Sequence, residues 1–260
     1  MNDDPTKDGP KAPDADSDDW RVVEVVPEGR DVTSLVMTGP DRKPHRPGQF
    51  GTIRVLTDQG WSEAHPFTIS CGPEENAVRM TIKHAGQFTE RIAALEPGAP
   101  VKFSGPYGVF LGDVEGQPRI VMVAGGVGIT PFLSVLRHFR AKKADNAVIL
   151  IWANKTRDDA FAAHELKEMT RELDLTVIHV LSREKTLPAA TAGTDKVRFE
   201  LGHVDRGLIR RHVLDAGWDA TAGFYLCGPP AMQEFVLAEM AACGIDPAAV
   251  DKEAFAYQDK

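Results

Sequence analysis

The segment HPFTIS at residues 65–70 is a first candidate for chemistry, because it places a cation-capable imidazole, an aromatic ring and a hydroxyl close together. Side chains of a strand alternate between its two faces, which predicts Pro66 and Thr68 on one side. His65 and Phe67 then lie on the other side, unless the strand is bent or bulged. An edge strand with a proline near its start accounts for the same residue types without any ligand.

A glycine-rich turn is the second candidate. The apolar run RIVMVAG leads into GGVGITP at residues 125–131, and Pro131 falls in the first turn of the next predicted helix, where its missing N–H costs nothing. Glycines let the backbone approach a phosphate, and the free amides and dipole of a helix N-terminus favour negative charge. A tight strand–helix turn without a ligand is equally compatible, because glycine-rich motifs often match by chance.

The third candidate is YLCGPPAM at residues 225–232, which ends another apolar run. Cys227 and Gly228 are predicted at the carboxyl end of a strand, the edge at which open α/β sheets bind ligands. A free cysteine near a strand end is more often a small buried hydrophobe than a reactive group. Cys227 taken alone therefore favours no site.

Extended runs separated by turns predict the first part of the fold. Between residues 20 and 108, short apolar runs alternate with turns rich in Pro and Gly, a pattern typical of an antiparallel β-domain, here a small barrel. The predicted strands cover residues 20–26, 32–38, 49–56, 65–70, 77–83 and 99–105. One short helix, which caps the barrel, is predicted over residues 88–95 because its apolar spacing is helical and it stops at a Pro-Gly pair.

Beyond a predicted linker at residues 109–117, apolar strands alternate with amphipathic helices. This pattern predicts an α/β doubly wound domain with a parallel sheet over residues 118–260. The predicted strands cover residues 119–125, 147–153, 175–182 and 223–229, and the helices cover residues 130–143, 159–173, 205–217 and 230–243. The glycine-rich turn and the cysteine segment therefore belong to one sheet.

Composition excludes several classes of partner. The chain has 260 residues and a net charge of −8, more than half of it from residues 1–19, which hold seven Asp and two Lys. This segment is predicted to be a disordered acidic tail, because it has too few apolar residues to offset its ordering entropy. The nearly neutral remainder offers no basic stripe to nucleic acid and no polybasic patch to a membrane.

The sequence also argues against a membrane span and against an iron–sulfur cluster. No apolar run approaches the roughly 20 residues that span a bilayer. The first residues lack the basic and apolar parts of a secretory signal, so we expect a cytoplasmic protein. The three cysteines, Cys71, Cys227 and Cys243, cannot supply the four thiolates of an all-cysteine cluster, and no metal site is predicted. Any redox chemistry needs another carrier.

Taken in order, HPFTIS, GQFT at residues 86–89, GPYG at residues 105–108, GGVGITP and CGPP resemble the ferredoxin–NADP reductase superfamily. The HPFTIS variant most resembles its ferric reductase and NADPH oxidase branch. The resemblance runs from about Trp20 to the C-terminus. It implies an FAD-binding antiparallel β-barrel followed by a doubly wound nicotinamide-binding domain, with flavin and nicotinamide meeting in the cleft between them.

The resemblance implies a flavin site in the first domain. In the family's motif, the residue at His65 contacts the flavin diphosphate or ribityl chain, the one at Phe67 packs on the isoalloxazine, and the one at Thr68 reaches its reactive nitrogen. Histidine in place of the family's arginine makes the first contact pH-dependent. The other flavin contacts implied are Pro66, Ile82, Lys83, Gly86, Gln87, Phe88 and Thr89, the last four at a helix start that cradles the diphosphate.

For the second domain, the resemblance implies nicotinamide dinucleotide contacts at both candidate segments. They are Gly125, Gly126, Gly128, Thr130, Pro131, Cys227, Gly228 and Pro229, with Cys227 beside the nicotinamide ring. Phe255 is implied to stack over the flavin face that the nicotinamide must occupy, and simple hydrophobic packing is its alternative.

The choice between NADPH and NADH depends on a weaker signal. Some NADPH-using relatives place Ser-Arg after a strand to bind the ribose 2′-phosphate, and Ser182 and Arg183 stand in that position, so we lean towards NADPH. NADH users can carry the same dipeptide. Lys155 and Arg157 also compete for the phosphate.

The function implied is hydride transfer from NAD(P)H to FAD, followed by electron transfer to a separate acceptor, which is a protein, a ferric chelate, a quinone or a flavin. Thr68, Cys227 and Phe255 are expected closest to the reaction. A ferric-chelate or free-flavin reductase is an alternative within the same class. A low-turnover redox-sensing or regulatory flavin subunit is an alternative from another class.

Overall fold

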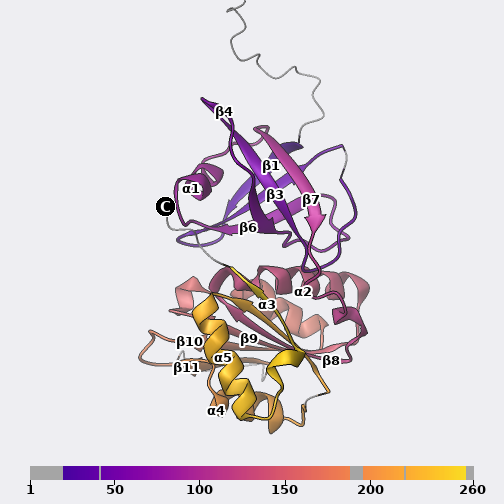
Figure 1. The fold of residues 1–260 in the computed structure, drawn as a ribbon, viewed down its shortest axis with the longest axis vertical. Coiled ribbons are helices and arrows are strands. Elements are labelled where there is room, and N and C mark those ends of the chain that lie inside the picture. The colour runs from indigo at the N-terminus through magenta and orange to yellow at the C-terminus, as the bar shows by residue number, and fades with distance from the viewer. Residues whose placement is uncertain (1–19, 41, 188–195, 220, 256–260) are drawn as a thin grey trace, which may run out of the picture.

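The computed structural model describes residues 20–40, 42–187, 196–219 and 221–255. The predicted tail at residues 1–19 lies outside these ranges. An antiparallel sheet forms the first half of the chain and a parallel sheet the second, and the two are stacked along the long axis of the molecule (Figure 1). This arrangement confirms the predicted fold class.

The first sheet is an antiparallel barrel. Its order is β4-β3-β7-β1-β2-β6, with β5 paired to β3. The strands are β1 (Trp20–Pro27), β2 (Val32–Thr38), β3 (Phe50–Thr57), β4 (Gly60–Trp61), β5 (His65–Thr68), β6 (Val78–Lys83) and β7 (Pro100–Tyr107). Just after β5, the Ser70 amide donates to the Arg79 carbonyl oxygen at 2.8 Å, which joins this segment to β6 and closes the barrel.

Alternating apolar residues fill the barrel. On β6, Val78, Met80 and Ile82 point into the core, and Arg79 and Thr81 point to the outer face, as the two-residue period of a strand requires. The helix α1 (Gln87–Ala93) closes one end, with Ile92 fully buried.

The second sheet is wholly parallel, in the order β11-β10-β9-β8-β12-β13. Its strands are β8 (Arg119–Gly125), β9 (Ala147–Asn154), β10 (Leu175–Leu181), β11 (Val197–Leu201), β12 (Gly223–Gly228) and β13 (Val250–Ala254). The chain builds outward from β8 to β11 and then returns to the other side of β8 with β12. Such a reversal leaves a crevice at the carboxyl ends of the two central strands, where α/β sheets bind ligands.

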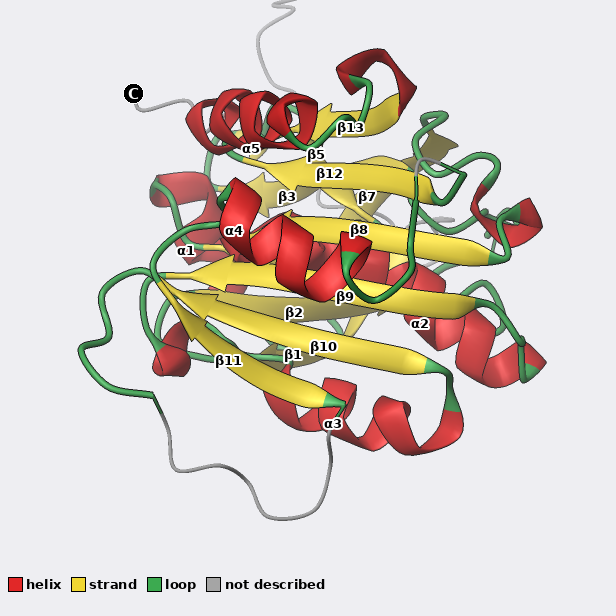
Figure 2. Cartoon of the chain, turned by 90° about the horizontal axis from the view of Figure 1, so that it is seen from below, coloured by secondary structure: helices red, strands yellow, loops and turns green. Residues whose placement is uncertain are grey.

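Helices cover both faces of the parallel sheet (Figure 2). The helices α2 (Thr130–Lys142) and α3 (Ala163–Glu172) pack on one face. On the other face lie α4 (Arg206–Ile209), which continues as a π-helical turn over Arg210–Leu214, and α5 (Pro230–Ala242). Short 3₁₀ turns cover Val114–Gly116, Gly126–Ile129, Arg157–Asp159 and Pro247–Ala249.

Besides the two-residue strand β4 and the strand β13, which the sequence patterns did not predict, two local features differ from the sequence prediction. The helix expected to start at residue 159 starts at Ala163, because Thr156 and Asp159 close a capping box around the short turn before it. The strand β11 was not predicted, since its side chains are only half-buried at the edge of the sheet and carry no long apolar run. Neither difference moves a candidate site residue.

The segment at residues 109–117, expected as a linker, packs into the second core. Phe110, Leu111 and Val114 are buried there against residues of α2 and the parallel sheet. The Leu111 amide also donates to Asp251 on β13 at 2.9 Å.

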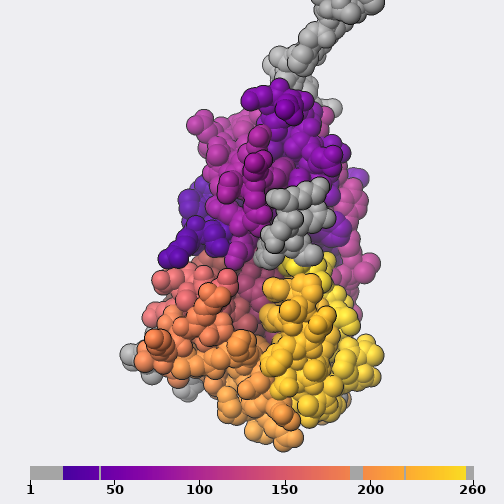
Figure 3. All heavy atoms as spheres, turned by 60° about the vertical axis from the view of Figure 1, so that its left-hand side comes forward, coloured from indigo at the N-terminus to yellow at the C-terminus, as the bar shows by residue number. Residues whose placement is uncertain are grey.

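The two domains meet along a broad boundary, with α2 facing the barrel (Figures 1 and 3). Two side chains of α2 donate hydrogen bonds to backbone oxygens directly after β5. Ser134 Oγ donates to Cys71 O at 2.6 Å, and Arg137 Nη1 donates to Ser70 O at 2.6 Å. One helix of the second domain therefore holds the strand that carries HPFTIS.

Candidate functional site

A cavity of about 690 Å³ opens between the barrel and the start of α2. Its walls come from β5, β6, α1, the turn before α2 and Phe255. All the residues expected to contact the flavin lie on its wall. They are His65, Pro66, Phe67, Thr68, Ile82, Lys83, Gly86, Gln87, Phe88, Thr89 and Phe255. The wall also includes residues that the sequence did not indicate: Glu63, Ala64, Thr81, Ala85 and Val127.

Thr68 is the most distinctive residue of this wall. Its side chain is buried, yet its hydroxyl oxygen has no hydrogen-bond partner among the described residues. The backbone is fixed on both sides, because Thr68 pairs with Phe50 of β3 and the next amide, Ile69 N, donates to Gln49 O at 2.9 Å. Buried hydroxyls normally have partners. The unpartnered hydroxyl makes Thr68 a candidate to hydrogen-bond a ligand in the cavity.

Rings from two elements lie together beside Thr68. His65 stacks on Phe88 of α1 with 3.6 Å between ring centroids, and Phe67 lies nearly parallel to Phe88 at 6.2 Å. His65 and Phe67 thus share one side of β5, as strand alternation predicts. Partial burial lowers the pKa of His65 below its ordinary value, and the nearby Glu63 carboxylate opposes this shift.

The start of α1 forms another part of the wall. Gly86 precedes the helix with φ of 144°, in the region that favours glycine, and so lets the chain turn from β6 into α1. Thr89 fixes this turn, because its hydroxyl donates to Gly86 O at 2.9 Å and accepts from Ala85 N at 2.8 Å. Lys83 lines the cavity and also pairs with Asp31 at 3.2 Å.

The glycine-rich turn meets the end of β12 at the reversal point of the sheet. A Cβ on Gly128 would collide with the backbone carbonyl of Cys227, so only glycine allows these two segments to approach this closely. Trp152 on β9 supports the turn from below, because its indole N–H donates to Gly126 O at 2.8 Å. Val127 and Thr130 carry the turn to the wall of the flavin cavity.

Cys227 is not among the residues that line this cavity. It is fully buried in the core that includes α2, and burial raises the pKa of its thiol far above the ordinary range. The end of β12 is held by Gln233, whose amide donates to Gly228 O at 3.0 Å and Glu253 O at 2.6 Å. Phe255 then places its ring at the cavity, with its amide on Gly228 O at 3.3 Å.

Two protein-family descriptions match this architecture. Residues 18–110 match an FAD-binding domain, and residues 122–238 match an oxidoreductase NAD-binding domain. A ferredoxin NADP⁺ reductase from Neisseria gonorrhoeae, solved with bound FAD and NADP, has the same fold with a TM-score of 0.73 at 15% identity, over 91% of this chain and 97% of that one. The chain therefore consists of an FAD-binding domain followed by an oxidoreductase NAD-binding domain.

Several curated relatives are larger proteins. A flavohemoprotein of Xylella fastidiosa is 29% identical over 93% of this chain and 60% of its own length. The ferredoxin reductase component of a 3-ketosteroid-9-alpha-monooxygenase from Mycolicibacterium smegmatis is 31% identical over 65% of this chain and 51% of its own length. The chain spans about 60% of the length of the relatives it matches best in coverage.

The residues of the barrel fit an FAD, as the match to an FAD-binding domain requires. The unpartnered Thr68 hydroxyl supplies a hydrogen-bonding group, and the rings beside it supply flat surfaces. The cavity volume of about 690 Å³ lies within the 300–1,000 Å³ usual for cofactor pockets.

The residues of the parallel sheet fit a dinucleotide at its carboxyl edge, where open α/β sheets bind ligands. Asn154, at the end of β9, is buried with both polar side-chain atoms unpartnered among the described residues. Ser182 follows the adjacent strand β10 and donates to Asn154 O at 3.3 Å, and Arg183 next to it is exposed. Ser182 and Arg183 thus lie at this edge and not on the flavin cavity.

Asn154 and Glu253 are two candidate residues that sequence reasoning missed. Burial, with help from the Asp251 carboxylate, raises the pKa of Glu253 to about 7, and its Oε2 atom has no partner within the described ranges. Glu253 stands opposite Cys227 in the pairing of β13 with β12. Neither residue carries a motif of its own, since only the folded sheet shows that their polar side-chain atoms are buried and unpartnered.

No metal centre or membrane helix emerges from the described part of the chain. No three His, Cys, Asp or Glu side chains gather there in an arrangement that holds a metal ion. The helices within those ranges are also too short or too polar to cross a bilayer.

Proposed function

We propose that this chain transfers hydride from NAD(P)H to FAD bound in the barrel cavity and passes the electrons to a separate acceptor. One observation carries the proposal: the unpartnered Thr68 hydroxyl, the α1 start, the end of the glycine-rich turn and Phe255 all line a single cavity. These groups come from both domains, so the cavity adjoins the nucleotide-binding edge of the parallel sheet.

Each group has a binding or positioning role in this proposal. Gly86 and the residues that follow it hold the diphosphate together with His65, and Phe67 packs beside the flavin ring. Thr68 hydrogen-bonds the reactive end of the flavin, which, when bound, supplies the hydride-accepting and stepwise electron-releasing chemistry. Phe255 covers the ring until the nicotinamide replaces it.

The nicotinamide residues belong to the crevice between β8 and β12. Gly125, Gly126, Gly128 and Thr130 bind the dinucleotide, with Pro131 fixing the first turn of α2. Gly228 and Pro229 border the nicotinamide at the end of β12. Cys227 acts as a neutral group that shapes the floor behind the nicotinamide, because its buried thiol stays protonated. NADPH is the preferred donor in this proposal, because the exposed Arg183 is available to the 2′-phosphate.

The acceptor is proposed to be a protein or a small oxidant that approaches the flavin cavity. The relative named as a ferredoxin reductase component of a monooxygenase favours a protein acceptor. The HPFTIS motif favours a ferric chelate, as in the ferric reductase branch. Steady-state assays of the purified chain with ferric chelates, a one-electron iron–sulfur protein, cytochrome, quinone and free flavin distinguish these acceptors.

The central test uses Thr68. The purified chain should bind FAD and release it intact on denaturation, and NADPH should bleach its absorbance. Replacing Thr68 with Val should slow this bleaching by roughly 5- to 150-fold, since one lost hydrogen bond is worth about 1–3 kcal/mol. Thr68→Ser restores the hydroxyl and should recover the rate. A chain that binds no added FAD overturns the proposed function.

A further inference from the structure

A chain of buried hydroxyl groups connects the flavin cavity to a second, charged hollow between the domains. Thr81 lines the flavin cavity, and its Oγ1 lies 2.8 Å from Ser34 Oγ. Ser34 Oγ in turn donates to Glu28 Oε1 at 2.6 Å. Ser70 joins the chain from the other side, with its Oγ 2.9 Å from Thr81 Oγ1.

Register explains why these groups meet. Ser34 on β2 stands directly opposite Thr81 on β6, and both side chains point to the outer face of the barrel, away from its apolar core. Ser34, Ser70 and Thr81 are all buried, at 0%, 0% and 5% exposure. The polar row is therefore sealed from water along its length.

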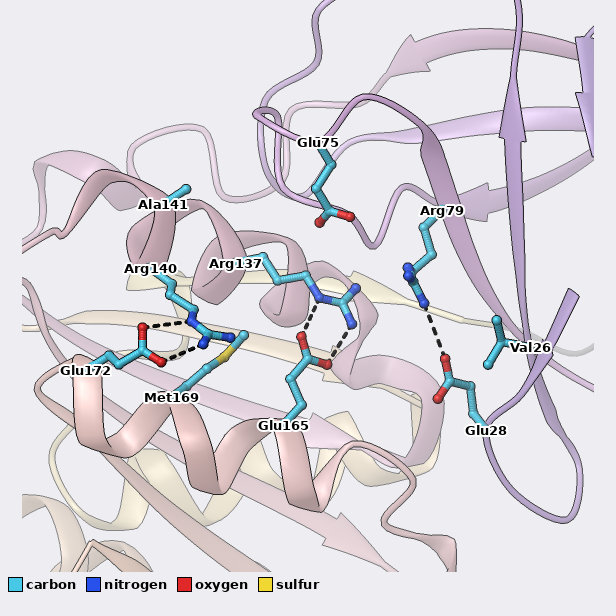
Figure 4. Close-up of a pocket in the computed structure, with 10 residues that line it drawn as sticks. All are labelled: Val26, Glu28, Glu75, Arg79, Arg137, Arg140, Ala141, Glu165, Met169 and Glu172. Atoms are coloured by element: carbon cyan, nitrogen blue, oxygen red, sulfur yellow. Dashed lines mark hydrogen bonds and ion pairs between the residues drawn. The ribbon is translucent and has the colours of Figure 1, made fainter. Parts of the chain in front are cut away.

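Glu28 ends this row in the second hollow, which has a volume of about 680 Å³ (Figure 4). Arg79 of β6 lies 3.6 Å from the Glu28 carboxylate, and the Glu28 side chain is 23% exposed. From the other domain, Arg137 and Arg140 of α2 face the same hollow, each held by a carboxylate of α3. Glu75 completes the charged lining.

The number of hydroxyl protons along this row of side chains fixes which group donates each hydrogen bond. Each hydroxyl has one proton to donate, and a carboxylate only accepts. The Ser34 proton goes to Glu28, so Thr81 must donate to Ser34, and Ser70 must donate to Thr81. This assignment is the only one in which all three side-chain hydrogen bonds form at once. If Ser70 instead donates to Arg79 O at 3.2 Å, the bond from Ser70 to Thr81 is lost and the other two keep their direction. All donors then point from the flavin cavity towards Glu28.

We propose that Thr81, Ser34 and Glu28 form a proton exit from the flavin cavity to the charged hollow. The proposal rests on the proposed function. Hydride transfer brings two electrons and one proton onto the flavin. Two equivalents of a one-electron acceptor then remove the two electrons, and the proton must leave the cavity. Thr81 accepts it and passes its own proton to Ser34, Ser34 passes its proton to Glu28, and the Glu28 carboxyl releases it to water in the hollow.

The test follows proton release and flavin oxidation separately. The FAD-loaded full chain is reduced, mixed with ferricyanide in weak buffer, and followed at once by flavin absorbance and a pH-indicator dye. Thr81→Val, Ser34→Ala and Glu28→Gln should each delay proton release behind that of the native chain, on the order of 100-fold for loss of a positioned proton-transfer group. Thr81→Ser keeps a hydroxyl and should restore release.

Two controls separate a relay from a structural role. Thr33→Val removes a neighbouring buried hydroxyl of β2 that bonds His84 instead, and should leave proton release unchanged. The pH dependence of the flavin midpoint potential should be the same in all variants, because a relay changes the rate of proton transfer and not the number of protons. Glu28 lies at the charged hollow, so Glu28→Gln leaves the barrel core intact. Its rate of proton release therefore tests the exit even if Thr81→Val or Ser34→Ala does not fold.

The outcomes are distinct for the two proposals. Proton release at the native rate in Thr81→Val and Glu28→Gln, with normal flavin reduction, overturns the proton exit and leaves the proposed function standing. A chain that fails to bind FAD overturns both. Equal delay in Thr33→Val shows a general structural effect and also overturns the exit.

Discussion

Replacing Arg137 with Met should destabilise the protein through the contact between its two domains. Arg137 Nε and Nη2 each donate to the Glu165 carboxylate at 2.7 Å, while Nη1 donates to Ser70 O on the barrel at 2.6 Å. The side chain of Arg137 is 14% exposed and that of Glu165 is 32% exposed. The substitution keeps most of the apolar stem and removes all three bonds.

The expected loss is about 2–4 kcal/mol. Removing one partner of a buried ion pair typically costs about 3–5 kcal/mol. Glu165 is nearly one-third exposed, so water replaces part of the lost interaction and lowers the expected cost by about 1 kcal/mol, to about 2–4 kcal/mol.

The loss should also depend on pH. Burial by itself raises the pKa of Glu165, but the hydrogen bonds and charge of Arg137 more than offset it, so the pKa is lowered overall. A carboxyl with a lowered folded-state pKa contributes stability above its unfolded pKa, about 4.3, and loses it as pH falls through the folded value. The difference between native and Arg137→Met chains should therefore shrink in acid.

Urea unfolding at neutral and acid pH measures this difference, and Arg140→Met is the matched control. Arg140 is on the same helix and forms a comparable two-bond pair with Glu172, but the side chains are 43% and 47% exposed. Its loss should cost only about 0–1 kcal/mol. We attribute the stabilisation of the interface to the burial of the Arg137 contact and not to the number of ion pairs. Equal losses of unfolding free energy in Arg137→Met and Arg140→Met would refute this argument.

Three further predictions concern the cofactors. FAD affinity should rise as pH falls below about 6.5, because burial lowers the pKa of His65 from that ordinary value and only the protonated ring attracts the diphosphate. His65→Arg should abolish this dependence in fluorescence titrations, and a native chain with flat affinity argues against the contact. Arg183→Ala should raise the KM for NADPH much more than for NADH, and equal increases would remove Arg183 from the 2′-phosphate site. Phe255→Ala should strengthen binding of oxidised nicotinamide and give a long-wavelength absorption band, because the ring no longer has to be displaced, whereas unchanged titrations would leave Phe255 a packing residue.

Local sequence patterns were sufficient for most of the fold. The apolar runs of β8, β9, β10 and β12 are buried on both faces, and such continuous apolar runs predict the strands of a parallel sheet. The two-residue strand β4 and the edge strand β11 lack that signal, because most of their residues are half-exposed and depend on neighbours for their conformation.

The candidate site was predictable only where it carries a motif. His65, Thr68 and Gly86 are found in short recognisable segments, and the structure places them on one cavity. Glu253 and Asn154 became visible only through burial without partners, which depends on the whole sheet. The row from Thr81 to Glu28 depends on register between strands far apart in the chain, which no local pattern records.

The order of the elements along the chain also affects how the protein is made. The barrel is complete when β7 ends at Tyr107 and has its own apolar core, whereas Phe255 follows β13. At ribosomal rates of about 5–20 residues per second, roughly 7–30 s of synthesis separate the two. During that interval the nascent barrel presents its half of the cavity without Phe255, which later lines it. FAD supplied to the ribosome-bound chain therefore meets an open site, and cofactor loading can precede synthesis of the last strand.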